Sequence, residues 1–70
     1  MKNLDIVRFK ETGNLYQILS LNCKMKNPHT REWQECVIYQ SLMDKYGKEI
    51  EHNIWVREKS DFNLKFEIWN

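Results

Sequence analysis

Two cysteines and two histidines are the only soft metal ligands of this 70-residue chain, and a cysteine beside a histidine could also act in nucleophilic catalysis. Structural zinc sites usually bring cysteines together in pairs that stand about two to four residues apart. Thirteen positions separate Cys23 from Cys36, and neither His29 nor His52 is paired with a second histidine. The spacing argues against a zinc site, and in a chain without a secretory signal we expect two reduced thiols that pack across a hairpin, with a surface-exposed thiol as the simpler alternative. We expect no metal site and no cofactor.

Catalysis by a thiol needs a base beside the sulfur atom and a third group that orients the base. Cys36 with His29 or His52 is the formal candidate, but nothing in the sequence brings these side chains together. A glycine-rich phosphate loop is not indicated either, because the only two glycines, Gly13 and Gly47, lie far apart. The sequence therefore predicts a protein that is not an enzyme and has no catalytic residues.

Basic side chains surround a turn at Pro28. If the flanking segments form a hairpin, these side chains gather at its tip beside Trp33. They could then contact phosphates while the indole stacks on a base. Glu32 and Glu35 would weaken such binding, and a solvated hairpin end is the simpler interpretation. Nucleic-acid binding is our alternative function, and its predicted residues are Lys24, Lys26 and Arg31, with His29 nearby.

Aromatic side chains form the pattern that we favour for function. Exposed aromatic faces of small β modules receive protein or peptide partners, and Trp, Tyr and Arg are the usual anchors. The competing interpretation places Tyr39 and Trp55 in the core, since a small β-barrel needs large side chains to fill it. The predicted protein-binding residues are Tyr16, Trp33, Tyr39, Trp55 and Arg57.

Five segments have the alternation and the β-branched or aromatic content of strands. Residues 60–63 fit a one-turn 3₁₀ segment, which Ser60 or Asp61 could cap. The order predicts one all-β domain over residues 1–70, a small five-stranded SH3-like barrel with a short 3₁₀ turn before the last strand. An open antiparallel sheet is the alternative. The strands are expected at residues 4–10, 15–26, 31–42, 53–58 and 64–69, and the safest core residues are Phe9, Ile38, Phe62 and Phe66.

The Asn-Pro turn between the second and third strands sets their expected register. Cys23 falls opposite Cys36, and Leu19 falls opposite Gln40. The second pair puts an amide among aliphatic side chains. We therefore expect a bulge or a strong bend near Ser20, which would relieve that conflict.

Several positions also match a known pattern of residues. They are residues 35–42, Gly47, residues 54–57 and Phe62, preceded by Phe9, Lys10, Gly13 and Tyr16. Together they resemble the small bacterial family catalogued as domain of unknown function 1653, over roughly residues 8–66. Glu58 stands where that family usually has proline, the hairpin tip at 22–32 differs, and the loop at 44–52 is longer. The resemblance implies a stand-alone SH3-like barrel and carries no established activity.

The formal net charge of +1 favours neither a nucleic acid nor a protein as partner. The first residues lack the apolar region of a secretory signal, and no apolar run approaches the ~18 residues of a membrane span. We therefore expect a cytoplasmic protein. A compact single domain of this size could be a bacterial or bacteriophage accessory protein that binds a host protein. The third interpretation is a self-associating structural protein, in which an edge strand or Trp69 pairs with a second copy.

Overall fold

Two long antiparallel strands form the centre of the protein, in a computed structural model that describes residues 1–69. Strand β2 (Leu15–Lys26) pairs with strand β3 (Trp33–Met43), and three shorter strands flank this pair. The other elements are β1 (Ile6–Phe9), β4 (Ile54–Glu58), helix α1 (Lys59–Lys65) and β5 (Phe66–Ile68). The order in the sheet is β4-β3-β2-β1-β5.

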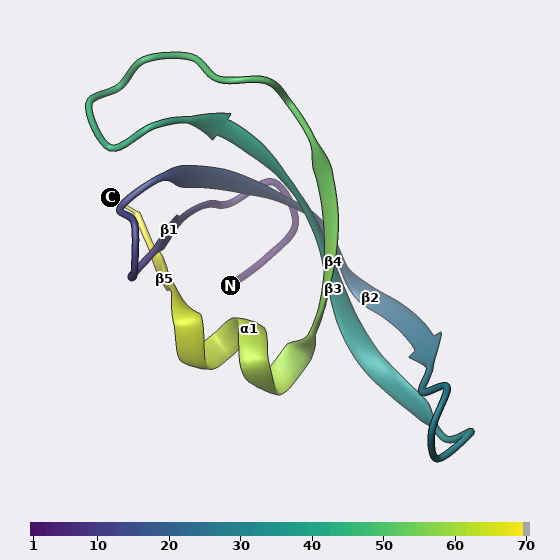
Figure 1. Cartoon of the computed structure of the whole chain (residues 1–70). Helices are drawn as coiled ribbons and strands as arrows, with labels where there is room; N and C mark the ends of the chain where they lie inside the picture. Colours follow the sequence, from purple (N-terminus) through teal and green to yellow (C-terminus); the bar gives the residue numbers. More distant parts are fainter. Residues whose placement is uncertain (70) are drawn as a thin grey trace.

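The sheet curls around a small core, while the end of the β2–β3 hairpin extends beyond the body (Figure 1). The chain measures 40 Å along its longest axis and 21 Å along the other two. All five predicted strands are present, and the prediction of an all-β protein is confirmed. Strands β4 and β5 end the sheet and do not pair with each other in the part of the chain described here. The sheet is therefore strongly curved but open.

A bulge in β2 bends the central pair, as the sequence predicted. The register shifts between Ile18 and Ser20 and again between Ser20 and Cys23. Cys23 lies opposite Cys36, as expected, but the shift moves Gln40 opposite Gln17 instead of Leu19. The two glutamine side chains hydrogen-bond at 3.1 Å, so the amide meets an amide and the predicted conflict is absent.

The core is built from aliphatic side chains of the sheet and from two phenylalanines near the C-terminus. Phe62 of α1 stacks on Phe66 of β5, with ring centroids 4.2 Å apart. This stack holds the helix against the sheet, because both rings are buried. Phe9 and Ile38, which were expected in the core, are half-buried. The buried cluster consists of Val7, Ile18, Val37, Tyr39, Phe62 and Phe66.

The connector before β5 is a seven-residue α-helix, so the predicted 3₁₀ turn was wrong. Neither Ser60 nor Asp61 caps it; the carboxylate of Glu58 accepts hydrogen bonds from both backbone N–H groups. Asp61 then pairs with Lys65 one helical turn later, and also with Arg57 at the end of β4. The cap and the Asp61–Lys65 pair favour a full α-helix over a single tight turn.

Cys23 and Cys36 form a disulfide, which corrects the expectation of two reduced thiols. Their Cα atoms lie 5.1 Å apart on neighbouring strands. The sequence correctly predicted that the two residues lie opposite each other. The reduced state was inferred only from the lack of a secretory signal, whereas the two sulfur atoms are close enough to bond. The bond ties the protruding hairpin just beyond the bulge.

Reduction of this disulfide should destabilise the protein. A cross-link between positions 13 apart in sequence restricts the unfolded chain, which is worth about 3 kcal/mol for a loop of roughly this length. We expect a reductant to lower the midpoint of urea unfolding, followed by tryptophan fluorescence. The double variant Cys23→Ala/Cys36→Ala should resemble the reduced protein and ignore the reductant. Two free thiols titrated in the denatured protein, after purification without a reductant, would contradict the Cys23–Cys36 disulfide.

Candidate functional site

The concave side of the sheet contains a solvent-open hollow of about 130 Å³. Its lining comes from all five strands, and most of it is aromatic. An apolar cavity of about 150 Å³ can hold a benzene-sized molecule, so this hollow suits one side chain or one small ring. The lining residues are Phe9, Tyr16, Tyr39, Trp55, Arg57 and Phe66.

Strand alternation places the β4 side chains in the hollow. Trp55 lies opposite Tyr39 and Arg57 lies opposite Val37, so both project to the same face as the core of β3. The intervening residues Ile54 and Val56 project to the other face. Trp55 keeps 49% of its surface exposed and forms the rim, whereas Tyr39 is buried and forms the floor.

Among residues 1–69, Arg57 is the only charged residue that lines the hollow. Its Nε donates to the Tyr39 hydroxyl at 3.2 Å, and its Nη1 donates to Asp61 Oδ2 at 2.7 Å. These two hydrogen bonds raise the pKa of Arg57, so the guanidinium stays charged. The group also lies 5.6 Å from the ring centroid of Phe9 and 5.5 Å from that of Phe66. Such distances allow cation–π attraction, which fixes the guanidinium over the aromatic wall.

Tyr16 completes the wall on the side of β2. Its ring meets Tyr39 and Phe66 edge to face, each at 5.5 Å between centroids. Burial, and next the neighbouring Tyr39, raise the pKa of the Tyr16 phenol, so this group is neutral near pH 7. The hollow therefore presents aromatic faces, two phenol groups and one compensated guanidinium. It offers recognition of an apolar or planar group rather than an acid–base pair.

Four of the five residues predicted to bind protein line this hollow. Tyr16, Trp55 and Arg57 do so as half-buried or exposed side chains, while Tyr39 also belongs to the core. Trp33 does not join them, because it begins β3 at the far end of the hairpin, where it is 68% exposed. The sequence analysis assigned Phe9 and Phe66 to the core alone. Their contact with Arg57 depends on the curl of the sheet and has no signal in the sequence.

A second, shallower hollow adjoins the first and shares Phe9 with it. It has a volume of about 310 Å³, and its other walls come from the loop after β1 and from the end of α1. Lys10 Nζ donates to the carbonyl of Leu64 across it at 3.1 Å.

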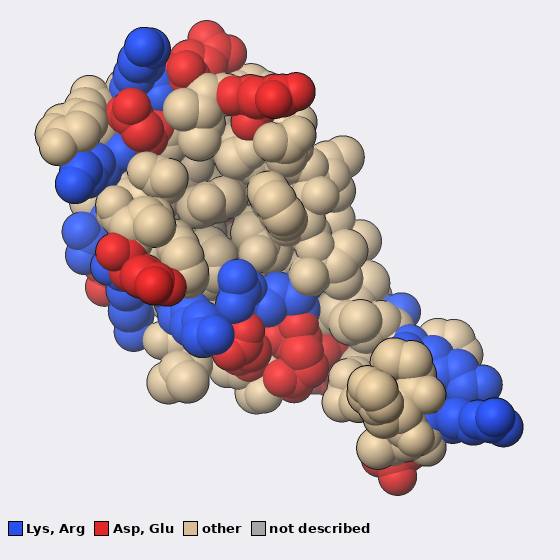
Figure 2. All heavy atoms as spheres, viewed as in Figure 1, with Lys and Arg blue, Asp and Glu red and all other residues tan. Residues whose placement is uncertain are grey.

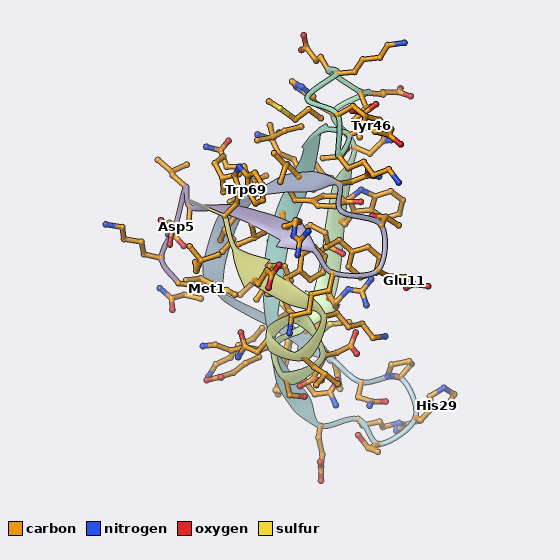
Figure 3. All side chains as sticks on the ribbon, turned by 90° about the vertical axis from the view of Figure 1, so that its left-hand side faces the viewer. Met1, Asp5, Glu11, His29, Tyr46 and Trp69 are labelled. Carbon is orange, nitrogen blue, oxygen red and sulfur yellow. A yellow bond between two sulfur atoms is a disulfide. The ribbon has the colours of Figure 1, made fainter. Side chains whose placement is uncertain are left out.

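The predicted basic group lies at the end of the hairpin, away from the hollows. Figure 2 shows Lys and Arg side chains gathered there, and Figure 3 places His29 at the opposite end of the molecule from Tyr46. Lys26 pairs with Trp33 and Lys24 pairs with Glu35, so these four residues share one face of the ribbon. Glu35 is the one acidic residue of these four, and Lys59 neutralises its charge in an ion pair at 3.6 Å.

Comparison with protein-family models, with curated proteins and with solved structures finds no match to this chain. Within residues 1–69, no three metal-binding side chains come together, and no helix is long and apolar enough to cross a membrane. Inference about function therefore depends on the arrangement of the side chains alone.

Acidification should loosen the helix that carries the partner of Arg57. Hydrogen bonds from Ser60 hold the pKa of Glu58 below its usual 4.5, and those from Arg57 and then Lys65 hold that of Asp61 below 3.8. Both groups are more acidic in the folded state. Their stabilisation is therefore complete above these usual values and is lost as the pH falls through the lowered ones.

We expect the thermal midpoint to fall as the pH is lowered from 7 to 3, most steeply below about pH 4. Glu58→Gln should flatten part of that dependence, while Glu11→Gln, which changes an exposed carboxylate that caps no helix, should leave it unchanged. Identical curves for Glu58→Gln and the wild type would show that the cap contributes nothing. Circular dichroism at fixed ionic strength provides the measurement.

Proposed function

We propose that this protein is a small non-catalytic protein-binding module, and that the aromatic hollow receives a side chain from its partner. The observation that carries the proposal is the convergence of Tyr16, Tyr39, Trp55 and Arg57 on one open hollow. Trp, Tyr and Arg are the residues that dominate binding energy at protein interfaces, especially around a central pocket. The floor is already packed, so little ordering of the protein is needed for binding.

A non-catalytic role has one further support. The disulfide occupies both sulfur atoms that the sequence offered as nucleophiles or soft metal ligands. Arg57 is engaged by Tyr39 and Asp61, and the tyrosines of the hollow have no base as neighbour in the described lining.

We also propose an SH3-like barrel as the fold family. The support is the strand order β5-β1-β2-β3-β4, together with a one-to-two-turn connector between β4 and β5. The open edge between β4 and β5 is the departure from a closed barrel. The resemblance to the bacterial family of unknown function points to the same fold.

A bacterial or bacteriophage accessory protein that binds a host protein remains our proposal for the biological role. The cytoplasm was the expected compartment, and the disulfide weighs against a strongly reducing one, because such bonds rarely persist there. Trapping of free thiols in cells before lysis would decide between the oxidised and the reduced state.

Removal of the rim tryptophan should abolish partner capture without unfolding the protein. We expect Trp55→Ala to lose a partner that the tagged wild type recovers from nuclease-treated extracts of its host. Because Trp55 is half exposed, its loss should cost far less stability than a core truncation. The measurement is quantitative mass spectrometry of the captured proteins, with thermal unfolding of each variant alongside.

Tyr46→Ala is the matched control, because Tyr46 is also aromatic, is 82% exposed and lies on a loop outside the hollow. It should recover the partner like the wild type. Equal capture by Trp55→Ala and wild type would overturn the assignment of the hollow. A collapse of the thermal midpoint would instead identify Trp55 as a structural residue.

Binding of a single-stranded nucleic acid by the hairpin is the second candidate. One observation favours it: Lys24, Lys26 and the exposed Trp33 share one face of the hairpin. Glu35 lies on the same face, and its negative charge is paired with Lys59. A base could stack on the indole while the lysines and Arg31 contact phosphates. This function uses residues that the hollow does not use.

A salt titration separates the two candidates. Binding of a fluorescent single-stranded oligonucleotide should weaken steeply as salt rises, since phosphate contacts release counterions. Trp33→Ala should reduce the affinity at every salt concentration, and Lys24→Gln/Lys26→Gln should reduce the salt slope. Trp55→Ala is the control that keeps the hairpin intact. The candidate fails if the oligonucleotide does not bind at low salt.

A further inference from the structure

Strand β4 is an outer strand of the sheet whose exposed side chains are large and apolar. It pairs with β3 alone, so one side of its backbone has no neighbouring strand among the described residues. The exposed fractions are 66% for Ile54, 49% for Trp55 and 53% for Val56. Natural edge strands are usually protected by lysine, proline, a bulge or a covering segment. Residues 54–56 contain none of these protective residues.

The other outer strand is protected. Strand β5 has only three residues, and Glu67 at its centre forms an ion pair with Arg8 of β1. The Arg8 guanidinium also lies 5.9 Å from the ring centroid of Trp69, just beyond β5. The contrast shows that the unprotected edge is a particular property of β4.

The hydrogen bonds to β3 show which backbone groups of β4 face outward. Ser41 N donates to the Asn53 carbonyl, and hydrogen-bonded pairs alternate along an antiparallel ladder. Trp55 and Arg57 therefore direct their N–H and C=O groups toward β3. The corresponding groups of Ile54 and Val56 point away from the sheet, where another strand could bond them.

We propose that a second copy of this chain pairs with β4 in antiparallel orientation, with Trp55 opposite Trp55 of the second copy. In this register the outward N–H and C=O groups of Ile54 can hydrogen-bond those of Val56 in the other copy. The Val56 groups of the first copy bond those of Ile54 in the second in the same way. The pairing is two-fold symmetric, as interfaces between identical chains usually are. It joins the two sheets into one continuous sheet.

Charge complementarity favours a second copy as the occupant. The segment before β4 carries the exposed carboxylate of Glu51, whereas Lys59 follows directly after the strand. With Trp55 opposite itself, Glu51 of one copy falls opposite Lys59 of the other, whose ammonium also lies 3.6 Å from Glu35 of its own chain. An antiparallel second copy therefore places one acidic and one basic residue together at each end of the paired strands.

The side chains of this register are also compatible on both faces. Ile54 and Val56 of the two copies form an apolar cluster on the outer face, because they project away from the hollow. The two Trp55 side chains stand next to each other on the inner face, beside the two hollows. A dimer thus presents two copies of the candidate binding site on one face of a shared sheet. The pairing itself requires no partner in the hollow.

The wild-type protein tests the pairing directly. Sedimentation equilibrium between roughly 1 and 500 µM should show a monomer–dimer exchange, because an interface of one strand pair lies at the small end of interface sizes. Amide hydrogen exchange should slow at Ile54 and Val56 as the protein concentration rises. The amide of Tyr46, on an exposed loop, should exchange at the same rate throughout.

Val56→Pro should give a monomer at every concentration. Proline removes the outward N–H of Val56 while leaving every hydrogen bond from β4 to β3 in place, and edge strands tolerate it on the solvent side. Glu51→Lys should weaken the dimer severalfold, whereas Glu11→Lys makes the same change in net charge away from β4 and should not. Partner capture by Glu51→Lys should equal that of the wild type, which separates this test from that of the hollow.

A wild type that is monomeric at all concentrations, or one that dimerises as well with Val56→Pro as without it, overturns the proposal. The proposal is also overturned if the Val56 amide is protected only when a partner protein is bound, and to the same degree at every concentration of this chain. That result would assign the edge of β4 to an extended segment of another protein. If Val56→Pro fails to fold, the concentration dependence of the wild-type Val56 amide decides the question alone.

Discussion

The bend in the central strand pair is the constraint on which the other features depend. Strands β2 and β3 pair over most of their length, and the bulge around Ser20 divides that pair into two parts with different surroundings. Before the bulge, Ile18 faces Tyr39 and both are buried. Beyond it, the disulfide joins the two strands at the fully buried Cys36, and residues 24–35 of the protruding ribbon are half-buried or exposed. A straight pair would separate β1 and β5 from β4, and the concave side would be lost.

Arg57 links the fold to the candidate site. Its guanidinium bonds Tyr39 of the sheet and Asp61 of the helix and lies over two rings of the wall. A charge so placed is stable only because its donors and its charge are compensated, as buried charges require. The same contacts set the angle between β4 and α1, and so fix how Phe62 reaches the core. The shape of the hollow therefore depends on the contacts of Arg57 that hold β4 and α1 against the sheet.

Much of this architecture could be predicted from local patterns. The five strands, the turn at Pro28 and the bend near Ser20 all follow from alternation and from known turn chemistry. The α-helix escaped prediction because its cap is a glutamate, a residue less usual at that position than serine or aspartate. Its i,i+4 ion pairs were visible in the sequence and could have signalled the helix.

The candidate site was only partly accessible to the same reasoning. Tyr16, Tyr39, Trp55 and Arg57 were grouped by residue type and expected face, and the hollow does contain them. Trp33 was grouped with them on the same grounds, yet the bulge and the length of the hairpin carry it to the other end of the protein. Residue type thus selects good candidates, whereas the curl of the sheet decides which of them meet. Curl is a cumulative property of twist and bulges, and no single segment of the sequence encodes it.

The open sheet also explains why a chain this small can present more than one surface. A closed barrel would hide both outer strands and would fill its concave side with its own side chains. Here the separation of β4 from β5 leaves a strand edge and an aromatic hollow beside each other. If β4 joins two copies, each partner that carries two segments for the hollow would bind the pair with the advantage of a raised effective concentration. A weak contact at each hollow would then suffice for firm binding, which suits a hollow that accommodates only one side chain.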